Sequence, residues 1–162
     1  MVDYEFAGLP LHVLLVHLTV IVVPVAALAT VLAAAWPAAR RRLGVVTPII
    51  ALVALIAVPI TVEAGEWLEE RVGATPLVAA HAALGKTLLP WAVAVFIVAL
   101  VQWLWFRFGS LRMPARATRL VVTILLAAVV AVTAVGSVLT VVQVGESGAR
   151  AVWTGSFQQN PR

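Results

Sequence analysis

Four long stretches of the chain contain no Asp, Glu, Lys or Arg, and they constrain its fold more than any other feature. They cover residues 11–35, 45–62, 87–106 and 120–145, and the second can extend into residues 63–68. An α-helix needs about 20 apolar residues to cross the hydrocarbon core of a bilayer, which is roughly 30 Å thick. The sequence therefore predicts an all-α integral membrane four-helix bundle. Its helices are expected at about residues 10–35, 44–70, 77–107 and 118–146, within a single domain of residues 1–162.

Composition excludes several classes of function. Charged residues make up 11% of the chain, whereas they make up about 25% of an ordinary soluble domain. The 11 basic residues are too scattered to form a phosphate-binding face, so no nucleic-acid partner is expected. The absence of cysteine removes disulfides, thiolate metal sites and c-type haem attachment. Motifs for serine hydrolysis, phosphate binding or metalloprotease chemistry are also missing, so the sequence assigns no enzymatic activity.

The charges of the loops predict how the bundle is oriented. The basic loops carry Arg40, Arg41, Arg42, Arg107, Arg112, Arg116 and Arg119. All 7 acidic residues lie toward the opposite side, near the N-terminus, around the end of the second helix and near the C-terminus. Because arginine-rich loops stay on the cytoplasmic side of a membrane, we expect the loops at about residues 37–44 and 107–118 to be cytoplasmic. Both termini are then outside a multi-pass cell-membrane protein whose main partner is the lipid bilayer.

Polar side chains gather at the end of the predicted bundle that carries no arginine loop. The set consists of His12, His17, Glu63, Glu66, His81, Lys86 and Glu146, and it includes all 3 histidines. A helical rise of about 1.5 Å per residue places His17 and Glu63 at a similar depth. We therefore expect His17, Glu63 and His81 to lie close together inside the bundle.

Two interpretations of this cluster stay open. In the first, the cluster holds a cofactor, because imidazole is a common ligand of Zn, Cu and Fe and helix bundles build such sites from inward-facing His and Glu. The ligands of haem b would be His17 and His81. The ligands of a transition metal would come from His12, His17, Glu63, Glu66 and His81.

In the second interpretation, the protein has a structural or interaction role, and the cluster only joins helices through hydrogen bonds and ion pairs. Glu63 or Glu66 would then pair with Lys86, and Glu146 with Arg150. The sequence alone does not choose between the two interpretations.

Four short blocks also carry a family resemblance: PLHVLLVH at residues 10–17, TVEAGEWL at 61–68, HAALG at 81–85 and GESGARAVW at 145–153. In order and spacing they resemble the Domain of Unknown Function 2231 family of small four-helix bacterial membrane proteins, which is distantly similar to membrane b-type cytochromes. The resemblance implies a haem or redox role for His17 and His81. Such relatives often have a histidine where Glu146 stands here, so a complete multi-histidine site is not implied.

The one-sided placement of the histidines limits any redox role. At most one haem could be held by two histidines, near the outer face, so electrons could not cross the bilayer through this chain alone. A redox function would need a quinol or an extracytoplasmic redox partner. Assembly as a homo-oligomer is also compatible with the sequence.

Overall fold

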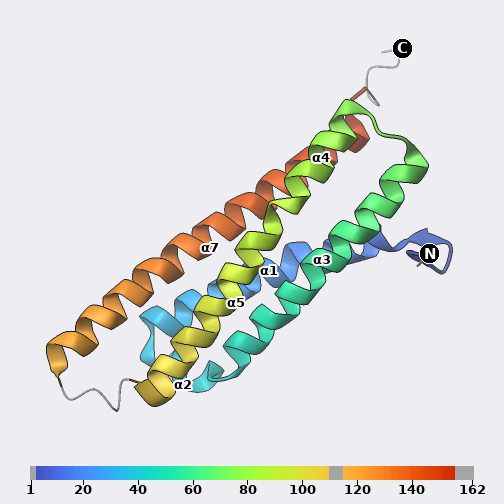
Figure 1. The fold of residues 1–162 in the computed structure, drawn as a ribbon. Coiled ribbons are helices and arrows are strands. Elements are labelled where there is room, and N and C mark those ends of the chain that lie inside the picture. Colours follow the sequence, from blue (N-terminus) through green and yellow to red (C-terminus); the bar gives the residue numbers. More distant parts are fainter. Residues whose placement is uncertain (1–2, 110–114, 156–162) are drawn as a thin grey trace, which may run out of the picture.

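The computed structural model describes residues 3–109 and 115–155, and most of these residues are helical (Figure 1). The elements in chain order are β1 (Glu5–Phe6), β2 (Leu9–Pro10), α1 (Leu11–Ala35), α2 (Pro37–Leu43), α3 (Val46–Val72), α4 (Pro76–Lys86), α5 (Leu88–Leu104), η1 (Trp105–Gly109) and α7 (Arg116–Trp153). The two short strands pair antiparallel and lead directly into α1. The segment η1 is a single π-helical turn that continues α5.

Four segments are long and apolar enough to cross a membrane: Leu11–Ala35, Val46–Val72, Pro76–Gly109 and Arg116–Trp153. They correspond to α1, to α3, to the α4–α5–η1 series and to α7. The prediction of an all-α bundle with four such helices is confirmed for the described residues.

The long helices pack in chain order around the bundle. Helix α1 packs against α3 and α7, and α5 packs against the same two helices from the other side. Helix α2 lies at one end, which we call the arginine end because it carries the basic loops (Figure 1). Helix α4 lies at the opposite end beside the last turns of α7, and we call this the histidine end (Figure 1).

Two local features differ from the sequence prediction. The segment expected as a loop at residues 37–44 contains α2, which begins at Pro37, a residue whose fixed φ suits the first helical turn. The third predicted helix is interrupted at Thr87, between α4 and α5. Pro90 explains the break, because it has no N–H to donate to the Lys86 carbonyl and its ring crowds that carbonyl. Arg112 lies outside the described residues.

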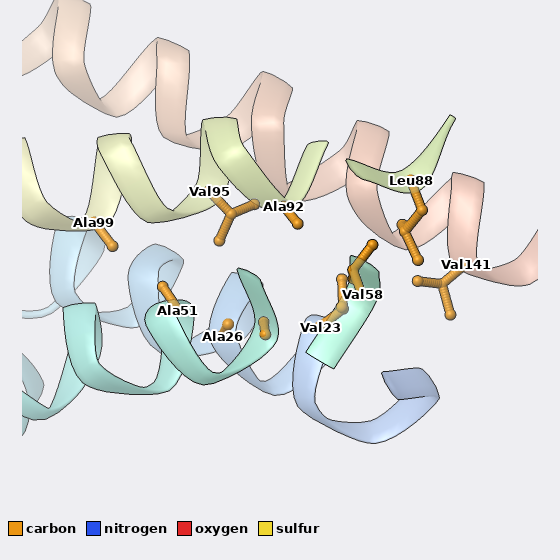
Figure 2. Packing of buried hydrophobic residues seen from close by; sticks show 10 residues of the cluster. Val23, Ala26, Ala51, Val58, Leu88, Ala92, Val95, Ala99 and Val141 are labelled. Carbon is orange, nitrogen blue, oxygen red and sulfur yellow. The ribbon is translucent and has the colours of Figure 1, made fainter. Parts of the chain in front are cut away.

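Small side chains form the centre of the bundle (Figure 2). The buried cluster consists of Val23, Ala26, Ala51, Ala54, Val58, Leu88, Ala92, Val95, Ala99 and Val141. Alanine and valine let helix backbones approach closely, which favours association in lipid, where dispersion and hydrogen bonds replace the hydrophobic effect between helices. A buried hydrogen bond of 2.8 Å between the hydroxyl groups of Thr19 and Thr61 joins α1 to α3 within this core.

Gly136 on α7 leaves room for the side chain of Trp91 on α5. A Cβ at Gly136 would lie 2.2 Å from the ring of Trp91. We expect Gly136→Ala to destabilise the protein by about 1–3 kcal/mol, the usual cost of overpacking a close contact. Thermal unfolding in mild detergent would measure the difference. Gly145→Ala on the same helix is the matched control, because a Cβ there meets no atom of the described residues within 4 Å; equal effects of both substitutions would contradict the packing.

Candidate histidine site

His12, in the second position of α1, is held against α3. Its Nδ1 lies 2.9 Å from the carbonyl oxygen of Thr61. A carbonyl oxygen only accepts, so Nδ1 carries a proton, and in the neutral imidazole Nε2 then has the lone pair. The ring lies directly on Gly65, where a Cβ would come within 2.9 Å of Nδ1. The missing side chain of Gly65 therefore lets the imidazole reach the α3 backbone.

His81 in α4 is held against α7 in the same way. Its Nδ1 lies 2.9 Å from Oγ of Ser147. The hydroxyl of Ser147 donates to the carbonyl of Val144 at 2.8 Å, so its oxygen is the acceptor for His81 and Nδ1 again carries the proton. A Cβ at Gly148 would lie 3.0 Å from Cε1 of the His81 ring. This imidazole also rests on a glycine and keeps a lone pair on Nε2.

The two imidazoles form a pair between α1 and α4. Their ring centroids are 6.3 Å apart, and the rings are inclined at 77°. Two imidazoles that share one ion, with metal–nitrogen bonds of about 2.0–2.1 Å, have ring centres roughly 5–6.5 Å apart. The separation of His12 and His81 lies at the upper end of this range.

His17 is placed differently from the sequence prediction. Its side chain is exposed, and its Nδ1 lies 2.6 Å from the carbonyl of Val13 in the same helix. The expected inward position is wrong, because five residues rotate His17 by about 140° from His12 around α1. The structure brings His81 together with His12 instead.

The two glutamates expected in the site have other partners. Tyr4 donates a hydrogen bond of 2.7 Å to Oε2 of Glu63, and Lys86 Nζ lies 2.7 Å from Oε1 of Glu66. The side chains of Lys86 and Glu66 are 60% and 47% exposed, so their ion pair stabilises the fold only slightly. The expected pairing of Glu146 with Arg150 is also present. Among residues 3–109 and 115–155, no group of three or more His, Asp or Glu is arranged to hold a metal ion.

Sequence reasoning missed the residues that orient the two imidazoles. A backbone carbonyl, that of Thr61, accepts from His12, and such an acceptor has no signature in a sequence. Ser147 is more visible, because it aligns at helical spacing with Thr140 and Gln143 on α7. Gly65 and Gly148 lie inside two of the blocks that carry the family resemblance. Only the structure shows that the ring of His12 packs on Gly65 and the ring of His81 on Gly148.

The chain was compared with protein-family models, with curated proteins and with solved structures, and none of them matches it.

The contact between Tyr4 and Glu63 predicts a measurable titration. The hydrogen bond to Glu63 raises the pKa of the Tyr4 phenol above its usual 10.0, with smaller contributions from desolvation and from the carboxylate charge. The neutral phenol thus favours the folded contact at pH below 10.0, and the contact weakens as the pH rises through the raised pKa. We expect Glu63→Gln to lower the pKa of Tyr4 toward 10.0.

Tyr4 is the only tyrosine in the chain, so the absorbance of tyrosinate during an alkaline titration reports on this residue alone. Glu66→Gln serves as the control, because Glu66 pairs with Lys86. An unchanged Tyr4 titration in Glu63→Gln would show that the hydrogen bond does not form.

Proposed function

We propose that this chain is a multi-pass membrane protein whose histidine end binds a single transition-metal ion. Insertion into lipid is supported by large apolar side chains that point away from the core on every long helix. Ile21 on α1, Ile56 on α3, Ile97 on α5 and Leu125 on α7 are all more than half exposed. Exposed apolar surface on all sides is unfavourable in water but is covered by lipid tails in a bilayer.

The distribution of charge supports an orientation with the arginine end in the cytoplasm. Arg40, Arg41 and Arg42 lie in α2, and Arg107 lies in η1. Glu66, Glu69 and Glu70 lie near the other end of the bundle, in the last turns of α3. Because the positive-inside rule counts basic residues close to the helix ends, the histidine end is assigned to the extracytoplasmic side.

Two exposed alanines test this orientation, since the chain has no cysteine of its own. Ala74 lies in the loop between α3 and α4, and Ala115 precedes α7 at the arginine end. We expect an impermeant thiol reagent added to intact cells to label Ala74→Cys and to label Ala115→Cys only after the membrane is permeabilised. Labelling of Ala115→Cys alone in intact cells would reverse the assignment.

The observation that carries the metal proposal is the hydrogen bond made by Nδ1 of each histidine. Because His12 and His81 each donate through Nδ1, both Nε2 atoms keep the lone pair that a metal ion needs. Metal-bound histidines are usually oriented in this way, with the other ring N–H donated to a carbonyl or another polar group. The two acceptors come from α3 and α7, and the histidines themselves come from α1 and α4. Four helices therefore hold the histidine pair in position.

A site with two protein ligands leaves coordination positions for exchangeable groups. Glu63 and Glu66 each use one carboxylate oxygen for Tyr4 or Lys86, so water rather than a third protein ligand completes the coordination. These polar and partly exposed surroundings favour a single ion over haem, which binds in a drier pocket.

Metal binding by the purified protein tests the proposal. After equilibrium dialysis against Zn²⁺ or Cu²⁺ and elemental analysis, we expect a stoichiometric ion that is lost in His12→Ala and in His81→Ala. His17→Ala is the matched control and should keep the ion, because His17 is exposed and bonded within its own helix. We expect Ser147→Ala to weaken binding by about tenfold or more, since it removes the group that orients His81.

Three results would overturn this assignment. The first is the absence of bound metal in the folded protein, and the second is loss of the ion in His17→Ala alone. The third is a visible haem spectrum in the purified protein that survives His12→Ala. The first result would leave the polar cluster with a purely structural function.

A further inference from the structure

A cavity of about 450 Å³ opens at the arginine end, far from the histidine pair. Its wall comes from α1, α2, α3, α5 and η1 and includes Arg41, Thr47, Gln102, Trp103, Phe106 and Arg107. No acidic residue lines it. The cavity thus combines basic, polar and aromatic groups at the level where the apolar helices end.

Two buried polar atoms in this wall have no hydrogen-bond partner among residues 3–109 and 115–155. Gln102 is 2% exposed; its Nε2 donates to the carbonyl of Thr30 at 3.2 Å, while its Oε1 has no donor. Thr47 is 3% exposed, and its hydroxyl is also without a partner. A buried polar atom left unpaired is destabilising, so an occupant that reaches and pairs with both atoms would gain binding energy.

The charges around the cavity favour the binding of an anion. Within the described parts of the chain, neither Arg41 nor Arg107 forms an ion pair. Helix α3 begins here, and its N-cap residue Val45 offers no side chain to the first N–H groups. Those N–H groups and the positive end of the helix dipole attract negative charge. An anion that accepts hydrogen bonds therefore fits the cavity.

Arg40 has a different function from its two neighbours in the wall. Its guanidinium donates to the carbonyls of Ala33 and Ala34 at the end of α1, at 2.7 and 2.9 Å. It also stacks 3.4 Å from the centroid of the Phe106 ring. Arg40 thus fixes the shape of the wall, and Arg41 and Arg107 remain to bind a ligand.

We propose that this cavity binds the phosphate group of a membrane phospholipid whose head group carries a hydrogen-bond donor, as phosphatidylglycerol does. The phosphate accepts from Arg41, Arg107 and the Thr47 hydroxyl, and the head group donates to Oε1 of Gln102. The rings of Trp103 and Phe106 provide an apolar surface for the start of an acyl chain. The proposal depends on insertion of the protein into a membrane but not on the metal site.

Native mass spectrometry of the full chain in mild detergent tests the proposal, with separate additions of phosphatidylglycerol, phosphatidylcholine and glycerol 3-phosphate. We expect phosphatidylglycerol to be retained in preference to phosphatidylcholine, whose head group has no donor. The double variant Arg41→Gln/Arg107→Gln should lose affinity by about fivefold for each arginine removed. Arg42→Gln/Arg116→Gln is the matched control, because neither residue lines the cavity, and it should bind like the wild type.

Thr47→Val keeps the test informative if the arginine variants fold poorly. The substitution removes an unpaired buried hydroxyl, so the protein without lipid should be at least as stable as the wild type. Retention of phosphatidylglycerol should nevertheless fall. Equal retention of both lipids, equal losses in the two double variants, or competition by glycerol 3-phosphate at lipid-like concentrations would overturn a phospholipid site.

Discussion

Contacts between a glycine on one helix and a ring on the next determine how the helices of this protein meet. The indole of Trp91 packs on Gly136, the imidazole of His12 packs on Gly65, and the imidazole of His81 packs on Gly148. In each case the missing Cβ lets a planar side chain rest on the backbone of another helix. The same kind of contact thus joins α7 to α5 and orients both histidines of the pair.

The lengths of the helices were predictable because the cost of placing a charge in lipid limits where charged residues occur. The uninterrupted apolar runs predicted four helices, and their observed bounds differ from the predicted ones by a few residues, except at the end of α7. The break at Thr87 was not predictable from the presence of a proline alone. Helices α1 and α3 continue through Pro24 and Pro59, whereas the third segment breaks three residues before Pro90. Whether a proline ends a helix depends on how neighbouring groups satisfy the freed carbonyl.

The sequence predicted which residue types form the candidate site and at which end of the bundle, but not which histidines pair. Counting residues along the helices gathered the histidines and glutamates at one end, and the expected pairs of Glu66 with Lys86 and of Glu146 with Arg150 are present. The same counting favoured His17 over His12, because depth along a helix contains no information about rotation around it. Rotation is decided by what each ring can reach: His12 meets the Thr61 carbonyl of α3, whereas His17 reaches only its own helix.

The protonation of the imidazole nitrogens decides whether His12 and His81 can bind a metal ion together. With only 3 histidines in the chain, selective ¹⁵N-histidine labelling and single substitutions would assign every ring signal by NMR. We expect His12 and His81 to carry a proton on Nδ1 and none on Nε2. We also expect added Zn²⁺ to shift these two Nε2 signals and to leave the signals of His17 unchanged. Protonated Nε2 atoms in the pair, or a Zn²⁺-induced shift confined to His17, would contradict metal binding by this pair.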